Sequence, residues 1–212
     1  MDATGKPYPV SFTVEYPEGP RKRLSVFFRP VLFVPIAVIL ILLVGTGSEY
    51  GLEEAGRGLA WSTAGFAVAP AVLMILFRRK YPRWWFDWNL SLARFCLRVG
   101  AYFAVLRDEY PSTDEEQTVH LEVPYPDAKT ELNRWLPLVK WLLVIPHLVV
   151  LAFVDVAAYF CFIIAWFAIL FTGRYPRTLF DFVVGVKRWQ MRVVWYAVLL
   201  STDRYPPFSL KA

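Results

Sequence analysis

Four long apolar stretches divide the chain, and charged segments separate them. In chain order they are residues 26–44, 59–77, 136–154 and 157–171. Each stretch is almost free of charge, and charged residues resume where it ends. Because about 20 apolar residues cross a bilayer core of about 30 Å, this pattern predicts four transmembrane helices.

The last two stretches are separated by Asp155 and Val156 alone, which predicts a tight hairpin. Asp155 is then a cap at the level of the lipid headgroups. Both stretches are short for a bilayer core. We take the hairpin to span the membrane fully, and a shallow hairpin that thins the bilayer is the alternative.

Two further segments, 84–106 and 178–200, are apolar on one side only. Each carries one aspartate and two arginines on a single stripe of a helix: Asp87, Arg94 and Arg98 in the first, and Asp181, Arg188 and Arg192 in the second. Three charged residues within a span cost on the order of 8–10 kcal/mol. We therefore predict two amphipathic helices that lie in the membrane interface.

The charged stripes allow two interpretations. In the first, Asp87 and Asp181 neutralise arginines of the other stripe, so that the two helices clasp each other. In the second, the arginines bind anionic lipid headgroups, and the aspartates favour the positively polarised helix starts.

Two short segments alternate between apolar and polar residues, as β-strands do. They are residues 10–17 and 119–126. Because an isolated pair of strands is marginally stable in water, we expect them to pair and to pack over the amphipathic helices. The result is a small cytoplasmic β element in an otherwise all-α integral membrane protein.

The chain also resembles itself. Residues 76–106 align with 170–200 at 12 identities in 31 positions. Further aligned pairs are Arg29 with Lys140, Pro35 with Pro146, Asp108 with Asp203 and Tyr110 with Tyr205. We interpret the chain as two tandem repeats, 1–111 and 112–212. Since each repeat crosses the membrane an even number of times, the repeats are parallel and related by a pseudo-two-fold axis along the membrane normal.

Composition and charge agree with a membrane protein. Hydrophobic residues make up 57% of the chain and charged residues 19%, against about 25% charged in average soluble domains. Of the 23 lysines and arginines, only Arg57 falls on the far side of the predicted spans. The positive-inside rule therefore places both termini in the cytoplasm. The same distribution explains the net charge of +5, so we predict no nucleic-acid partner.

Catalytic and metal-binding motifs are missing from the sequence. Cys96 and Cys161 lie far apart, with no second thiol or histidine at ligand spacing. We predict no enzyme, cofactor or metal. His147 is the polar candidate within the third span, and we expect a hydrogen bond to a neighbouring helix; a proton relay, a haem ligand or a substrate contact are the alternatives.

The second repeat carries two recognisable segments, residues 171–189, which begin Phe-Thr-Gly-Arg-Tyr-Pro-Arg, and residues 202–210, Thr-Asp-Arg-Tyr-Pro-Pro-Phe-Ser-Leu. In these segments the chain resembles a DUF4389-type family of bacterial membrane proteins, a domain of unknown function. The first repeat matches less closely, since Arg79 replaces Gly173. The resemblance implies a bacterial membrane protein and brings no activity with it.

These observations together predict a multi-pass protein of the bacterial inner membrane. We expect a non-enzymatic accessory, scaffold or lipid-organising role. The expected partners are the lipid bilayer, anionic lipids, and either further copies of the chain or other membrane subunits. A small transporter or channel, with its path on the pseudo-two-fold axis, is the alternative.

Overall fold

The computed structural model describes residues 8–19, 21, 23–44, 71–112, 115 and 117–211. This part of the chain is mostly helical and contains one two-stranded sheet. Its elements in chain order are β1 (Ser11–Val14), α1 (Arg23–Val44), the π-helix η1 (Met74–Arg78), α3 (Arg83–Phe103), β2 (Val119–Glu122), α4 (Leu136–Thr172) and α5 (Arg177–Ala197).

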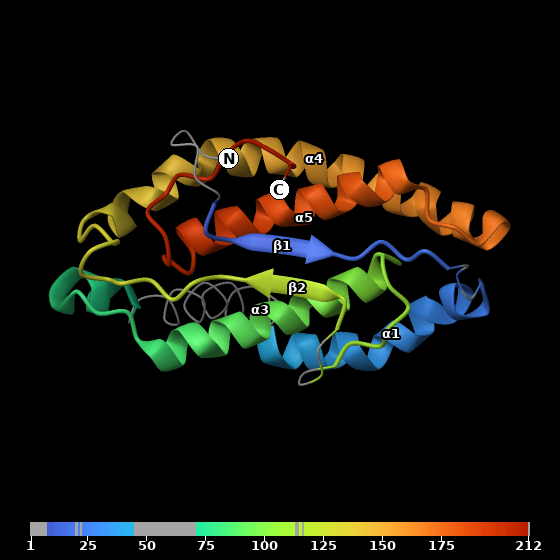
Figure 1. The fold of residues 1–212 in the computed structure, drawn as a ribbon, viewed down its shortest axis with the longest axis horizontal. Coiled ribbons are helices and arrows are strands. Elements are labelled where there is room, and N and C mark those ends of the chain that lie inside the picture. Colours follow the sequence, from blue (N-terminus) through green and yellow to red (C-terminus); the bar gives the residue numbers. More distant parts are fainter. Residues whose placement is uncertain are drawn as a thin grey trace, which may run out of the picture.

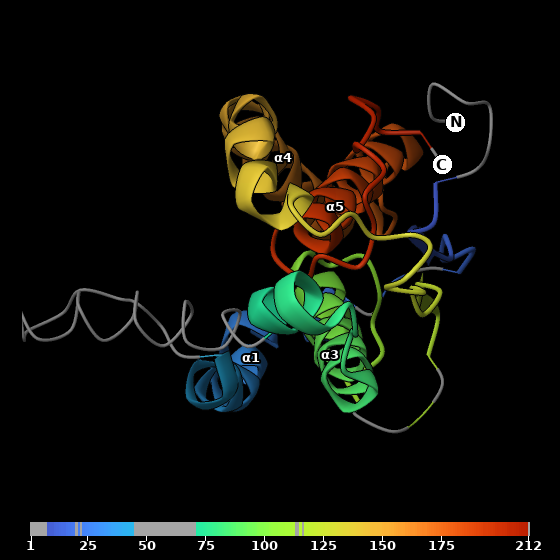
Figure 2. The same ribbon diagram turned by 90° about the vertical axis from the view of Figure 1, so that its left-hand side faces the viewer.

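The elements form three layers along an elongated molecule. In Figure 1, α4 runs beside α5, α1 runs beside α3, and the two strands lie across the middle. Figure 2 shows the same layers from one end, with α1 and α4 on one side, α3 and α5 in the centre and the strands on the other side. The long helices therefore run parallel to the layers, and none of them crosses from one face of the molecule to the other.

The predicted strands exist and pair as expected. β1 and β2 are antiparallel, and Phe12 lies opposite Leu121. These two side chains are buried against the helices, whereas Thr13 and His120 on the opposite face of the sheet are exposed. The sheet contacts α5 through β1 and α3 through β2. The alternation of apolar and polar residues therefore marks the buried and exposed faces of each strand.

The predicted amphipathic segments are the helices α3 and α5. Each begins directly after a Tyr-Pro dipeptide, with Pro82 and Pro176 in extended conformation at the N-cap. Proline suits the start of a helix because its φ is restricted and it has no backbone N–H that would need a hydrogen-bond partner. Their buried side chains form the main core together with the strands, and Trp195 and Tyr196 of α5 are almost completely enclosed.

The predicted hairpin at 136–154 and 157–171 is wrong. Residues Leu136–Thr172 form one continuous α-helix of 37 residues, which is about 55 Å long. No glycine or proline lies between Pro146 and Gly173 to end the helix. Asp155 is not a cap in a turn: it lies within α4 and accepts a hydrogen bond from Gln190 of α5. The charge of Asp155 was taken as the sign of a turn, whereas in the structure this side chain has a partner on the neighbouring helix.

The first pair of predicted spans has two different outcomes. The stretch 26–44 lies within α1, which includes Pro30 and Pro35. The stretch 59–77 falls mostly outside the described residues, and only its end is described, as a helical turn followed by η1. Among the described helices, α4 is long and apolar enough to cross a membrane.

Candidate functional site

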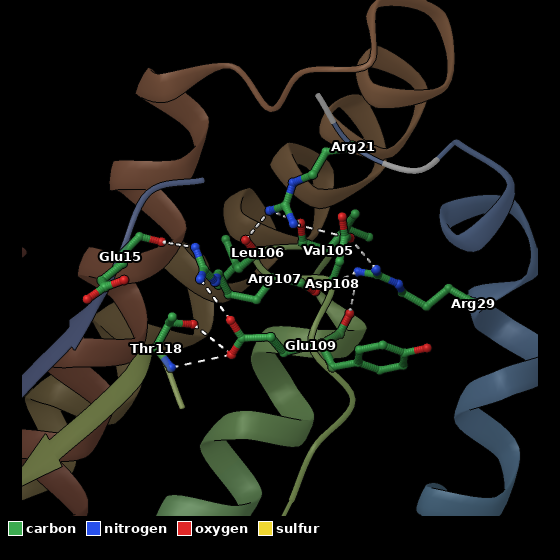
Figure 3. Close-up of polar contacts among 10 residues, drawn as sticks. Glu15, Arg21, Arg29, Val105, Leu106, Arg107, Asp108, Glu109 and Thr118 are labelled. Atoms are coloured by element: carbon green, nitrogen blue, oxygen red, sulfur yellow. Dashed lines mark hydrogen bonds and ion pairs between the residues drawn. The ribbon is translucent and has the colours of Figure 1, made fainter. Parts of the chain in front are cut away.

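The polar centre of the first half of the chain is Asp108, which follows α3. Two buried guanidinium groups meet this carboxylate: Arg21 Nη1 lies 3.1 Å from Oδ1, and Arg29 Nη2 lies 2.5 Å from the same atom. Figure 3 shows Arg21 and Arg29 approaching Asp108 from different segments of the chain. The arrangement ties the start of α1 to the end of α3.

The same two arginines also satisfy the end of α3. Arg21 donates to the carbonyl oxygens of Val105 and Leu106, and Arg29 Nη1 donates to Tyr102 O at 2.9 Å. The last carbonyls of a helix have no partner within the helix, so cations there are favourable. Burial lowers the pKa of Arg21, and the neighbouring Asp108 carboxylate opposes this shift.

A second polar group lies beside this centre, on the strand side. Arg107 Nη2 donates to Glu109 Oε1 at 2.9 Å, and Thr118 Oγ1 donates to Glu109 Oε2 at 3.0 Å (Figure 3). Burial favours the neutral form of Glu109, but these bonds more than offset it, and the pKa of Glu109 lies below its ordinary value. Glu15, Glu109 and His120 help to line a shallow open hollow here. Among the described residues, no group of three or more His, Cys, Asp or Glu is placed to hold a metal ion.

The polar centre of the second half is Asp203, which follows α5. Lys140 of α4 is completely buried, and its Nζ lies 2.7 Å from Asp203 Oδ1. The same Nζ donates to Thr202 O at 2.8 Å and lies 5.0 Å from the centre of the Tyr196 ring. In the first half, Arg29 lies 4.5 Å from the centre of the Tyr102 ring. Each centre thus combines a buried cation, an aspartate and a tyrosine at positions that align in the sequence.

The two halves of the chain also make similar contacts with the strands. Arg94 Nε of α3 donates to Leu121 O in β2 at 3.1 Å, and Arg188 Nε of α5 donates to Phe12 O in β1 at 2.9 Å. The predicted arginines therefore hold the strands of the sheet, and each one reaches the strand that comes from the other half of the chain.

The remaining members of the predicted stripes have different surroundings. Arg98 donates to Ser112 O at 2.8 Å, and Arg192 donates to Ser209 O and Lys211 O at the C-terminal tail. Asp87 and Asp181 are exposed. Within the described part of the chain, neither aspartate forms an ion pair with an arginine of the other helix.

His147 belongs to α4, and its side chain faces α5 and is completely buried. Its Nδ1 accepts a hydrogen bond of 3.1 Å from Trp189 Nε1, which is the contact between helices that we expected. The imidazole ring stacks on Phe208 of the tail, with ring centres 3.8 Å apart. Among the described residues, the other ring nitrogen, Nε2, has no hydrogen-bond partner. The residue thus fastens both α5 and the tail to α4.

A comparison with known protein families finds a match for part of the chain. Residues 135–209 match the family model described as Domain of unknown function (DUF4389). This part of the chain is similar to that family. No curated protein and no solved structure matches the chain.

The matched region begins just before α4 and ends in the tail after α5. It contains the buried pair of Lys140 and Asp203 as well as His147 and its partners. The matched region is therefore a structural unit: two antiparallel helices, with a tail that returns over both of them.

The two buried cation centres were not predicted from the sequence. Arg29 and Lys140 were noted as an aligned pair, and they were otherwise counted only among the cations on the near side of the predicted spans. A usable signal was present, because the alignment pairs these two cations with each other and pairs Asp108 with Asp203. A cation within an apolar stretch that recurs together with a carboxylate indicates a buried ion pair.

Proposed function

We propose that the protein is a non-enzymatic membrane scaffold or accessory subunit that lies within one leaflet of a bilayer. In this proposal α1 and α4 lie in the acyl-chain region, parallel to the membrane plane. The layer of α3 and α5 lies at the interface, and the strands face water. The positive-inside rule then places the strand face in the cytoplasm of a bacterial cell.

The outer face of α4 carries this proposal. The lysine, histidine and acidic side chains of this helix are Lys140, His147 and Asp155, and all three bond to α5 or the tail. The opposite side exposes large apolar side chains along the whole helix: Leu138, Trp141, Leu142, Ile145, Leu148, Val149, Phe153, Val156, Phe160, Ile164, Phe167 and Phe171. An apolar surface of this extent is too large for a protein face that stays in water.

α1 has the same distribution of polar and apolar side chains as α4. Beyond its first residue, Arg29 is its only ionisable side chain, and this arginine is 2% exposed and turned toward Asp108. Large apolar side chains such as Phe27, Val31 and Val34 are exposed on the outer side. α1 and α4 lie on the same side of the molecule (Figure 2), so their outer faces form one apolar surface.

The charged groups on the strands and on α5 favour an orientation of α4 parallel to the membrane. Strand residues Glu122 and His120 are exposed there, and the charged side chains Asp181 and Arg188 lie on α5, which runs along α4. If α4 crossed the bilayer, these groups would enter the acyl-chain region with it. Each charge there costs about 2.5–3.5 kcal/mol. A helix that lies in the interface avoids that cost.

Several pairs of contacts support the two tandem repeats. Tyr16 donates to Tyr175 O at 2.6 Å, and the aligned Tyr125 donates to Tyr81 O at 2.5 Å. Each bond joins the strand of one half to the helix start of the other half. With Phe12 opposite its own aligned residue Leu121, these bonds favour a pseudo-two-fold axis through the centre of the sheet.

Depth measurements test the orientation. A nitroxide label is placed singly at Leu142, Phe153, Phe160 or Phe167, in a variant without Cys96 and Cys161, and the protein is reconstituted into vesicles. Accessibility of each label to oxygen and to a water-soluble nickel complex gives its depth. We expect the four labels to lie at a similar depth, because α4 runs parallel to the surface.

A label at Thr13, on the exposed strand face, is the control and is expected in water. A depth that rises to a maximum near Phe153 and falls toward both ends of α4 would mean that the helix crosses the bilayer. Labels on α4 that are accessible to nickel throughout would mean that this face does not enter lipid.

The accessory role is tested separately by native mass spectrometry of the protein released gently from its own membranes. We expect a discrete complex, made of further copies or of other membrane subunits. The alternative of a transporter or channel needs polar groups that face a path, whereas the polar side chains of α4 bond to α5 and the tail. A monomer free of protein partners contradicts the accessory role.

A further inference from the structure

The segment that joins η1 to α3 carries four exposed cations within six residues: Arg78, Arg79, Lys80 and Arg83. We call these four residues the basic junction. Within the described part of the chain, none of them forms an ion pair. Arg83 lies 5.6 Å from the centre of the Tyr125 ring, and the other three side chains extend from the surface. The basic junction therefore presents concentrated positive charge that no acidic side chain among the described residues neutralises.

Large apolar side chains surround the basic junction. Phe77 is 71% exposed on η1, and Trp84 and Trp88 are 71% and 57% exposed on α3. Tryptophan next to arginine and lysine is typical of the headgroup level of a membrane, where the ring contacts the acyl boundary and the cation contacts phosphate.

The position of the basic junction in the fold fits this level. η1 lies at one end of the elongated molecule (Figure 1). Viewed from that end, it lies between the layer of α1 and α4 and the layer of the strands (Figure 2). With α1 and α4 in the acyl-chain region, the basic junction lies at the depth of the lipid phosphates.

The aligned segment of the second half lacks most of these features. Thr172 and Gly173 stand at the positions of Arg78 and Arg79, and Thr178 stands at the position of Trp84. Arg174 and Arg177 are the exposed cations that remain there. The excess of charge and tryptophan is therefore a feature of one end of the molecule, and α5 begins in the aligned segment without it.

We propose that the basic junction binds the phosphate headgroups of anionic glycerophospholipids and so selects the lipid around this end of the protein. This proposal rests on the membrane orientation above. The sequence had suggested Arg94, Arg98, Arg188 and Arg192 as the residues that bind headgroups. In the structure their guanidinium groups bond to carbonyl oxygens of the protein, so we assign the headgroup contact to the basic junction instead. Arginine suits the task because its planar guanidinium forms paired bonds to phosphate oxygens.

Binding of short-chain lipids to the full chain in neutral detergent tests the proposal. Dioctanoyl phosphatidylglycerol is the probe, and dioctanoyl phosphatidylcholine is its uncharged counterpart. The test variant carries Arg78→Gln, Arg79→Gln, Lys80→Gln and Arg83→Gln. The matched control carries Lys129→Gln, Arg174→Gln, Arg177→Gln and Lys211→Gln, which removes four exposed cations elsewhere.

We expect the native chain to bind phosphatidylglycerol at least tenfold more tightly than phosphatidylcholine. The test variant loses that preference, and the control variant keeps it within about twofold. Equal losses in the two variants would show a net-charge effect and overturn the proposal, as would an unchanged preference in the test variant. Competition by inorganic phosphate or by RNA at concentrations equal to that of the lipid would assign the site to a different anion.

Two measurements separate this result from other failures. An unchanged unfolding temperature of the test variant shows that it folds, and a version with lysine at all four positions is expected to recover the preference in large part. The depth of the α4 labels is measured independently of lipid binding. If those labels report water, the membrane orientation fails whatever the lipid preference; if they report lipid and the preference is absent, only the basic junction is wrong.

Discussion

Lys140 Nζ lies 2.7 Å from Asp203 Oδ1, and this ion pair joins the first turns of α4 to the segment after α5. Lys140 has no exposed surface, while the Asp203 side chain is 18% exposed. A charged lysine in such a place depends on its partner, because a buried charge without a counter-charge is unstable. The pair therefore fixes where α4 begins relative to the rest of the domain.

Asp203→Asn is expected to lower the free energy of unfolding by about 3 kcal/mol, because it leaves the Lys140 charge buried and unpaired. Lys140→Met alone leaves a partly exposed carboxylate and costs less. The double variant Lys140→Met, Asp203→Asn recovers most of the loss, since an apolar side chain replaces the ion pair. Equilibrium unfolding in detergent micelles measures all three variants.

The control for this series is Asp181→Asn. Asp181 is exposed and, among the described residues, has no ion pair, so its replacement is expected to change stability by less than about 0.5 kcal/mol. If Asp203→Asn behaves like Asp181→Asn, the ion pair does not hold α4 in place.

Gly185 and Gly100 lie in the two amphipathic helices and give opposite predictions. A Cβ atom on Gly185 would lie 2.9 Å from both Cβ and O of Leu210, a contact too close for the tail to keep its place. The same carbonyl accepts a bond from Arg188 Nη1. Gly185→Ala is therefore expected to lower stability by about 1 kcal/mol and to release the tail.

Gly100 is the matched control, because a Cβ atom added there meets nothing within 4 Å. Gly100→Ala is expected to stabilise α3 by about 0.5–1 kcal/mol. Hydrogen exchange of the tail amides separates the two variants: faster exchange near Leu210 is expected in Gly185→Ala only. Equal exchange in both would mean that the close contact at Gly185 does not hold the tail.

The sequence predicted α3, α5 and the two strands, but it did not predict the continuous helix α4 or the partners of the charged side chains. The spacing of apolar residues and the positions of the prolines predict α3, α5 and the two strands, because these signals lie within each segment. The single helix α4 was missed because a lone aspartate in an apolar run resembles a turn. In the structure Asp155 lies within the helix and accepts a hydrogen bond from Gln190, which is 35 residues away in the sequence.

The arginine stripes were identified as polar faces, and their partners could not be predicted. Arg94 and Arg188 bond to carbonyl oxygens of the strands, and backbone carbonyls carry no signature in a sequence. The repeat alignment was the best available guide, because it pairs Arg29 with Lys140 and Asp108 with Asp203. Reading both pairs together would have indicated the two buried centres.

Glu109 gives a prediction for low pH. The ordinary pKa of a glutamate is about 4.5, and the pKa of Glu109 in the folded protein lies below it, because Arg107 and Thr118 bond to the ionised form. A lowered folded pKa means that the ionised group stabilises the fold at pH above its unfolded pKa. That contribution is lost as pH falls through the folded pKa.

The comparison of the native chain with Glu109→Gln measures this contribution. We expect the difference between their unfolding temperatures in detergent to be largest near neutral pH and to shrink below about pH 4.5. Other carboxylates titrate in both proteins and cancel in the difference. A difference that stays constant over the acid range would mean that the bonds of Glu109 do not depend on its charge.

Arg79 and Gly173 occupy aligned positions, and both have a left-handed backbone. Arg79 has φ 48° at the end of η1, and Gly173 has φ 75° at the end of α4. Glycine adopts this conformation without strain, whereas a residue with a Cβ atom costs about 1–2 kcal/mol there. We expect Arg79→Gly to stabilise the protein by about 1 kcal/mol, measured as an increase in unfolding temperature in neutral detergent.

Gly173→Ala is the reciprocal variant and is expected to destabilise by at least about 1 kcal/mol, because the added Cβ is strained and lies 3.4 Å from Arg23 Nε. Neutral detergent matters in both cases, because it removes the anionic lipid that the basic junction would bind. In vesicles rich in anionic lipid, the gain in Arg79→Gly is expected to shrink, because one of the four cations is gone. If Arg79→Gly instead lowers the unfolding temperature in neutral detergent, the Arg79 side chain stabilises the fold itself. The lipid contact would then have to come from the other three cations of the basic junction.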